Sequence, residues 1–242
     1  NRLVDQIWKS GKTKIHETEN LEEVLNSLDL KPDFAYPANS EAELMFVHRK
    51  LSDTEIFWVN SRSDKPESVK ATFRVSGKKP EIWHPETGEK EEVSYIIEDG
   101  RTTVNLDLTP NDAVFVVFSQ KAKDNKVELV KAENKVLSTV EGTWNVAFQP
   151  ERGAPANAVF ENLDSYTENA DAGIKYFSGK ALYTKTFMLE DAAIQKGKLV
   201  IDLGEVKNLA EVIINGKNLG VVWKKPFRLN ISDAVKAGEN QL

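Results

Sequence analysis

The sequence of 242 residues contains no cysteine and only three histidines, His16, His48 and His84. A chain without cysteine has no disulfides, no thiolate zinc ligands and no thiol nucleophile. The three histidines stand far apart and form no H-x-x-x-H pair on a helix, which is the usual spacing of a helical zinc site. We therefore expect no metal site and no cofactor.

The sequence also lacks an excess of positive charge and any long apolar run. Lys and Arg total 32 against 38 Asp and Glu, for a net charge of -6, which offers no basic footprint to a nucleic acid. No stretch approaches the roughly 20 apolar residues that span a bilayer. We expect neither a nucleic-acid partner nor membrane insertion. The 40% hydrophobic content indicates one large or two ordinary folded domains.

Two short helices are predicted before residue 38. Apolar residues keep helical spacing over residues 3–8, and Asn20 can cap a second helix with Glu23 three positions later. Two short amphipathic helices cannot bury both apolar stripes against each other. We therefore assign residues 1–38 to the helical tail of a preceding domain and expect exposed stripes.

Short β-type runs separated by turn residues predict an antiparallel β-sandwich over residues 39–120. Apolar residues alternate along 69–75, which places one face of that strand in a core. Asp99-Gly100 is a strong tight-hairpin signal. Residues 113–118 are apolar on both faces, which is typical of a central strand.

A second all-β domain is predicted over residues 137–242. The preceding residues 121–136 are rich in charge and form the predicted linker, with one strand at most over 127–130. Residues 144–148 alternate as a strand, and Asn215-Gly216 is the best hairpin turn of the chain. The fold class is mainly β, with two antiparallel β-sandwich domains after a short helical remnant. The chain starts at Asn and stops at the start of a strand, so we expect a fragment truncated at its C-terminus.

The sequence gives no basis for assigning a catalytic residue in this chain. The sequence has no nucleophile elbow and no glycine-rich phosphate loop. Glycoside hydrolysis needs two facing carboxylates about 5 to 9.5 Å apart, and among 38 acidic residues some meet that distance by accident. His48 and Arg49 end a strand and are interpreted as a satisfied domain-interface pair.

Aromatic side chains are candidates for sugar binding, because sugar rings can lay their C–H faces on Trp or Tyr planes. Trp58, Trp83 and Trp144 lie inside strand patterns and are expected in the cores. Trp223 follows an apolar pair and precedes Lys224, at a point where the chain leaves a strand. We therefore take Trp223 as an exposed carbohydrate-binding candidate.

Sequence motifs over nearly the whole chain resemble known glycoside hydrolases. The later motifs resemble the sugar-binding, galactose-binding-like jelly-roll domain of family 2 glycoside hydrolases; they cover residues 176–187, 203–206, 212–220 and 237–242. The earlier motifs resemble the C-terminal part of family 106 glycoside hydrolases, the α-L-rhamnosidase-like enzymes; they cover residues 46–49, 56–60, 80–88 and 114–118.

The resemblance implies an inverting enzyme of bacterial polysaccharide degradation, periplasmic or extracellular, whose catalytic glutamates lie on an upstream barrel. This chain would be an accessory C-terminal fragment, inactive alone, and its partners would be a plant or microbial carbohydrate and the upstream catalytic domain of the same polypeptide. The alternative is an independent carbohydrate-binding module.

The resemblance also assigns a sugar contact to Asn215, because the Asn of the corresponding turn in family 2 galactosidases reaches toward the substrate. A short amide at a tight turn offers both a donor and an acceptor to sugar hydroxyls. The alternative is that Asn215 is present only because Asn tolerates the left-handed backbone of a type I′ turn.

Overall fold

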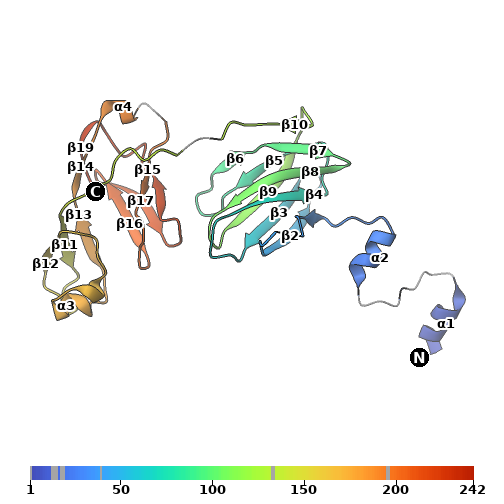
Figure 1. The fold of residues 1–242 in the computed structure, drawn as a ribbon, viewed down its shortest axis with the longest axis horizontal. Helices are drawn as coiled ribbons and strands as arrows, with labels where there is room; N and C mark the ends of the chain where they lie inside the picture. Colours follow the sequence, from blue (N-terminus) through green and yellow to red (C-terminus); the bar gives the residue numbers. More distant parts are fainter. Residues whose placement is uncertain (1, 12–15, 17–19, 39, 132–133, 195–196) are drawn as a thin grey trace. The chain divides into compact units, whose positions relative to one another are not determined.

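The computed structural model describes residues 2–11, 16, 20–38, 40–131, 134–194 and 197–242 (Figure 1). These residues form several antiparallel sheets and few helices, which confirms the predicted fold class. The chain divides into two compact units, residues 1–131 and 132–242, called unit 1 and unit 2 below. Among the described residues, no helix has the length and apolar character needed to cross a membrane.

Unit 1 begins with the two predicted helices, α1 (Arg2–Ser10) and α2 (Leu21–Ser27). The Asn20 side chain caps α2: its Oδ1 accepts the Glu23 backbone N–H at 3.3 Å, and its Nδ2 donates to the Glu23 carboxylate at 2.8 Å. No residue of either helix is buried, and Leu3 and Leu21 are 69% and 71% exposed. The expected exposure of the apolar stripes is confirmed.

Two five-stranded antiparallel sheets form the predicted sandwich. The first has the order β1 (Phe34–Ala35), β4 (Glu67–Phe73), β8 (Arg101–Leu108), β7 (Tyr95–Glu98) and β10 (Lys126–Val127). The second has the order β2 (Leu44–Lys50), β3 (Glu55–Ser61), β9 (Ala113–Lys121), β5 (Lys78–Trp83) and β6 (Lys90–Glu92). Strand β9 is central, as its two apolar faces predict. Pairing of β1 and β10 extends the first sheet beyond residues 39–120 on both sides, into the predicted tail and linker.

The core of unit 1 is built around three fully buried phenylalanines, Phe57, Phe73 and Phe118. Their ring centroids lie 4.9 to 6.0 Å apart in tilted or edge-on arrangements, the geometry that aromatic pairs prefer. Phe57 and Phe118 come from the second sheet and Phe73 from the first. These three rings therefore join the two sheets.

Both predicted hairpin turns have the backbone that their sequences require. Asp99 and Gly100 have φ of +50° and +73°, and Asn215 and Gly216 have φ of +51° and +78°. Two consecutive residues with positive φ define a type I′ turn, which matches the twist of the strands on either side.

Unit 2 has a three-stranded sheet with the order β12 (Asn157–Phe160), β11 (Trp144–Phe148) and β13 (Ala181–Thr184). Its other strands pair in twos: β14 (Thr186–Leu189) with β19 (Gly238–Gln241), β15 (Val200–Asp202) with β18 (Arg228–Asn230), and β16 (Ala210–Ile214) with β17 (Lys217–Val222). Short helical turns are η1 (Tyr166–Glu168), α3 (Ala172–Lys175) and α4 (Asp191–Ile194). The finer assignment of this unit as a galactose-binding-like jelly roll stays a prediction. Residues 132 and 133 of the predicted linker lie outside the described residues.

We expect Phe118→Ala to destabilise the chain by about 3 to 5 kcal/mol, because it leaves a cavity between the two sheets of unit 1. The matched control is Leu21→Ala on the exposed stripe of α2, which should change stability by less than about 0.5 kcal/mol. Urea unfolding followed by tryptophan fluorescence measures both. Equal stability of the two variants would contradict this account of the core.

Candidate functional site

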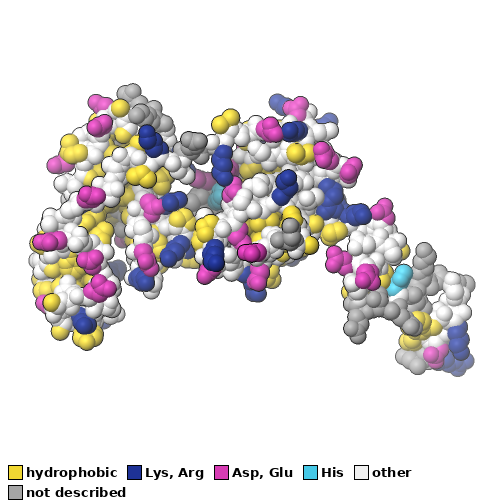
Figure 2. All heavy atoms as spheres, in the orientation of Figure 1, with side chains coloured by type: hydrophobic (Ala, Val, Ile, Leu, Met, Phe, Trp, Pro, Cys, Tyr) yellow, Lys and Arg dark blue, Asp and Glu magenta, His cyan; other side chains and the backbone are white. Residues whose placement is uncertain are grey.

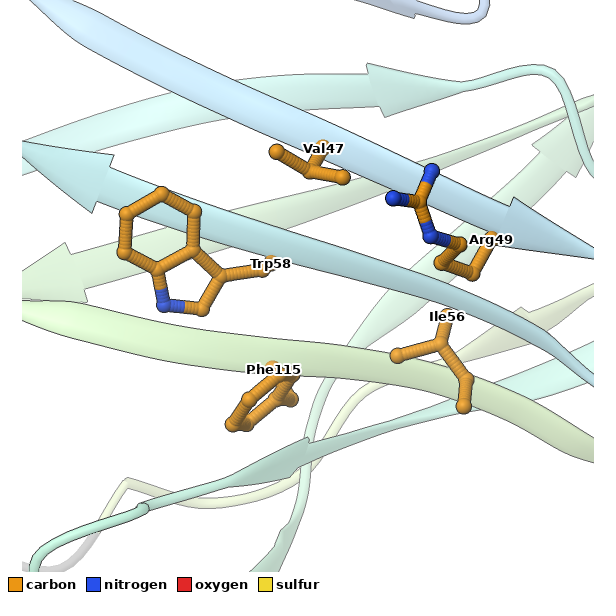
Figure 3. A pocket seen from close by; sticks show the side chains of 5 residues that line it. All are labelled: Val47, Arg49, Ile56, Trp58 and Phe115. Carbon is orange, nitrogen blue, oxygen red and sulfur yellow. The ribbon is translucent and has the colours of Figure 1, made fainter.

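The outer face of the second sheet of unit 1 carries a hollow of about 410 Å³ (Figure 3). The hollow is lined by side chains of β2, β3 and β9, namely Val47, Arg49, Ile56, Trp58 and Phe115. Trp58 lies between Phe57 and Val59, which are both fully buried. Because side chains alternate along a strand, Trp58 faces away from the core.

Three aromatic residues of this outer face lie in register on adjacent strands. Trp58 of β3 is paired with Phe115 of β9, and Phe115 is paired with Trp83 of β5. We call these three residues the aromatic row. Val47 of β2 is paired with Trp58, and Lys90 of β6 is paired with Trp83, so the row reaches both edge strands.

The expectation that all three strand tryptophans lie in cores holds for Trp144, which is 8% exposed. It is wrong for Trp58 and Trp83, which are only half-buried on the outer face. Their strands carry apolar side chains on both faces, so a period of two does not say which side is inside. The sequence did offer one signal that these rings could face outward. Each of Trp58, Phe115 and Trp83 stands next to an apolar residue that can point into the core in its place.

The charged groups beside the aromatic row are the two acids Glu81 and Glu92 and the cations Lys79, Arg49 and Lys90. Glu81 accepts a hydrogen bond from Trp83 Nε1 at 3.2 Å. Lys79 Nζ lies 2.9 Å from the Glu92 carboxylate and 3.5 Å from the Glu81 carboxylate. Arg49 donates only to the His48 carbonyl, at 3.4 Å, and Lys90 Nζ lies 4.0 Å from the ring centroid of Trp83. Within the described part of the chain, neither Arg49 nor Lys90 forms an ion pair with a carboxylate.

His48 lies between two carboxylates inside unit 1. Its Nδ1 is 2.9 Å from Asp33 Oδ2, its Nε2 is 3.0 Å from Glu55 Oε2, and its ring stacks on Phe57 at 4.0 Å. Arg74 also binds Asp33 through its Nε, at 2.7 Å. The hydrogen bonds from His48 and Arg74 hold the pKa of the Asp33 carboxyl below its usual value. His48 is thus satisfied, and its contacts fix the chain where it enters the first sheet.

We expect Asp33→Asn to destabilise unit 1 by about 1 to 3 kcal/mol at pH 7, because it removes charged hydrogen bonds to His48 and Arg74. The Asp33 pKa is lower in the folded chain than its unfolded value of about 4, so this stabilisation is present above the unfolded pKa. It is lost as the pH falls through the folded pKa. The difference in urea midpoint between wild type and variant should therefore shrink from pH 7 toward pH 3.

The control for this pH series is Glu41→Gln, which replaces an exposed carboxylate. Its difference from wild type should stay small throughout. A pH-independent gap for Asp33→Asn would contradict the assignment.

The predicted site residue Asn215 uses its side-chain amide inside unit 2. Its Nδ2 donates to the Ala234 carbonyl and to Asn240 Oδ1, both at 2.8 Å, and its Oδ1 accepts the Gln241 backbone N–H at 2.9 Å. Asn240 is almost fully buried and donates in turn to the Lys236 carbonyl at 2.7 Å. Both amide hydrogens of Asn215 are therefore committed, and one Oδ1 lone pair is left for a ligand. Its sugar contact stays a prediction.

The other predicted site residue, Trp223, directly follows β17 and is 59% exposed. Asn215 precedes β17, so the strand separates the two residues. Eight residues of extended chain span about 26 Å, at about 3.3 Å per residue. The structure therefore does not bring Asn215 and Trp223 together around one sugar ring, and a role for Trp223 would be a separate contact.

We expect Asn215→Gly to cost about 1 to 3 kcal/mol of stability, because Gly keeps the left-handed turn but removes the amide that ties it to β19. Asn215→Ala should cost about 1 to 2 kcal/mol more, because a non-glycine residue is strained there without a compensating side-chain bond. The matched control is Asp99→Gly in the other type I′ turn, which should be close to neutral in urea unfolding. An unchanged stability of Asn215→Gly would show that the amide is free to serve a ligand.

Among the described residues, acidic and metal-ligating side chains do not form a second candidate site as clear as the aromatic row. A polar hollow of about 400 Å³ at one end of the sandwich is lined in part by Glu41, Asp64 and Glu67. Glu67 accepts a hydrogen bond from Ser61 Oγ at 2.6 Å. Among the described residues, no three His, Cys, Asp or Glu side chains are placed to hold a metal ion. The expected lack of metal and cofactor stays a prediction.

Comparison with known proteins relates the chain to glycosidases. Residues 1–97 match the family 106 glycoside hydrolase model, described as α-L-rhamnosidase. A curated protein of Formosa agariphila, named "Putative beta-glucuronidase", is 31% identical over 182 residues, which cover 72% of this chain and 15% of that protein. The solved structure of a rhamnosidase from Novosphingobium sp. PP1Y matches with 38% identity and a TM-score of 0.89, over 99% of this chain and 23% of that one. The chain thus spans less than a quarter of the length of these two relatives.

Proposed function

We propose that this chain, which belongs to the α-L-rhamnosidase family 106 of glycoside hydrolases, is an accessory, non-catalytic region of an enzyme that degrades polysaccharide. The observation that carries the proposal is the match of 99% of the chain to only 23% of a rhamnosidase, at 38% identity. Most of that relative therefore lies outside the matched region, and it is there that we place the catalytic domain.

The chemistry of the hollow beside the aromatic row supports a non-catalytic role. A glycosidase needs one carboxyl group that is protonated at working pH and a second carboxylate near it. No acidic side chain lines the hollow beside the aromatic row. Of the nearby acids, Glu92 is bound by Lys79, which holds the pKa of its carboxyl below the usual value. Such a carboxylate is a poor proton donor.

The exposed apolar stripes of α1 and α2 support a partner domain in the same polypeptide. Large apolar side chains on one face of each helix are exposed, including Leu3, Trp8 and Leu25. An amphipathic helix gains most of its stability from packing that face against another element. We therefore propose the upstream catalytic domain as the partner of this segment, in a periplasmic or extracellular bacterial enzyme.

The second candidate function is an independent carbohydrate-binding module, and the aromatic row is the observation that favours it. The half-buried rings of Trp58 and Phe115, in register on one sheet face, offer surface to a sugar ring, while the Lys90 ammonium covers one face of the third ring, Trp83. A glycan array with the 242-residue chain tests for this second function. Binding there is compatible with the accessory role, which the aryl rhamnoside assay below tests. An autonomous module should bind with millimolar to micromolar affinity, about -4 to -8 kcal/mol.

We expect the 242-residue chain to release no phenol from aryl α-L-rhamnosides above a buffer blank, because the catalytic carboxylates lie outside it. The positive control is a longer protein that includes the preceding domain and should turn over under the same conditions. Enzyme-dependent release of phenol by the short chain, above the blank and proportional to its concentration, would contradict the accessory role.

A further inference from the structure

We propose that the aromatic row of unit 1 binds an acidic oligosaccharide, a short run of hexuronate residues laid across the strands of the second sheet. This inference rests on the proposed function only in taking the ligand to be a carbohydrate. It adds where the ligand binds, how it lies relative to the strands and which charge it carries.

The row runs perpendicular to the strands, because its members are cross-strand partners. Trp58 and Phe115 are partners on adjacent strands, which lie about 4.8 Å apart. Val47 and Ile56 border the rings on the same hollow (Figure 3). The rings are half-buried, so neighbouring side chains already limit their motion and binding costs little further side-chain entropy. Such a surface suits the C–H faces of consecutive sugar rings.

A cation stands at each end of this surface. Arg49 lies on edge strand β2, two residues after Val47, and Lys90 lies on the opposite edge strand β6. Four strand spacings separate these edges, about 19 Å. At the β6 end the Lys90 ammonium lies over the Trp83 ring, 4.0 Å from its centroid, in a cation–π contact that stabilises the ammonium. A ligand would therefore contact Lys90 at this end, and not the face of Trp83 that Lys90 covers.

The balance of charges beside the row indicates that the ligand is negatively charged. Lys79 lies within ion-pair distance of both Glu81 and Glu92, so its single positive charge offsets one of these two carboxylates. Neither carboxylate forms an ion pair with Lys90, and the three cations Arg49, Lys79 and Lys90 outnumber the two acids. Arg49 likewise has no carboxylate partner in the described part of the chain, and a guanidinium binds a planar carboxylate with two parallel hydrogen bonds. An apolar protein surface on the row would bury Arg49 without an acid, at a large desolvation cost. A neutral sugar would leave both cations unused, whereas a hexuronate chain matches the rings and the cations together.

The test is titration of the 242-residue chain with tetragalacturonate, read by tryptophan fluorescence and by calorimetry, against a neutral galactose tetrasaccharide. We expect tetragalacturonate to bind at millimolar concentration or tighter, and at least about tenfold tighter than the neutral sugar. Arg49→Gln and Lys90→Gln should each weaken tetragalacturonate about three- to tenfold and leave the neutral sugar unchanged. Raising the salt concentration should weaken only the acidic ligand.

Variants at two tryptophans locate the site. Trp58→Ala should abolish binding of both ligands to unit 1, whereas the matched control Trp223→Ala in unit 2 should change affinity less than about twofold. Because Trp58 is half-buried, folding of its variant is checked by circular dichroism, and the exposed Arg49→Gln gives an independent result if Trp58→Ala fails to fold.

Each contrary result overturns the inference. No binding of tetragalacturonate at millimolar concentration would leave the row without an acidic ligand. Equal affinity for the neutral sugar would remove the role of Arg49 and Lys90. Loss of binding in Trp223→Ala but not in Trp58→Ala would move the site to unit 2. None of these results concerns hydrolysis, so the accessory role fails only if the short chain releases phenol from aryl rhamnosides.

Discussion

One face of strand β9 packs in the core of the sandwich, and the other lies on the outer face of the second sheet. The core-facing residues set the register of β9 between β3 and β5. Its inward residues Val114, Val116 and Phe118 are buried in the sandwich core, where Phe118 meets the rings of the other strands. A slip of one residue would turn this whole set to the outside, so the core strongly specifies the register. The outward residue Phe115 then falls opposite Trp58 and Trp83. The alignment of the outer rings is therefore a consequence of how the core packs.

Local pattern was enough to predict most of the longer strands and the two tight turns, because both depend on residues that are close in sequence. It missed the short strands β6, β12 and β18. Alternation along β4 and the Asp99-Gly100 pair each determine their own geometry. Strands β1 and β10 have two residues each, too few to show a period, and they exist only through pairing with β4 and β7. The outward direction of Trp58 depends on which of the two apolar faces of β3 packs against the first sheet. That packing is a long-range contact, which the period of the sequence does not reveal.

The candidate site residues show the same division between local and distant causes. The left-handed backbone of Asn215 follows from its place before Gly216, and the sequence predicted it. Its amide is committed to Ala234, Asn240 and Gln241, which lie 19 to 26 residues later in the chain. A side chain that suits a sugar hydroxyl suits a buried backbone group equally well, because both need one donor and one acceptor. Residue type at a turn therefore cannot distinguish a ligand contact from a structural one, and only the partners do.

Net charge and local charge lead to different conclusions about an acidic ligand. A net charge of -6 argues against a polyanion that covers much of the surface. In physiological salt, however, exposed charges farther apart than about 8 Å are largely screened from each other. A short ligand on the aromatic row therefore responds mainly to the charges beside it. There three cations, Arg49, Lys79 and Lys90, stand beside two carboxylates, Glu81 and Glu92, which share Lys79 as their ion-pair partner, while Arg49 and Lys90 have no acidic partner among the described residues. A chain that is acidic as a whole can thus carry a local excess of positive charge beside the aromatic row, because the cations there outnumber the carboxylates.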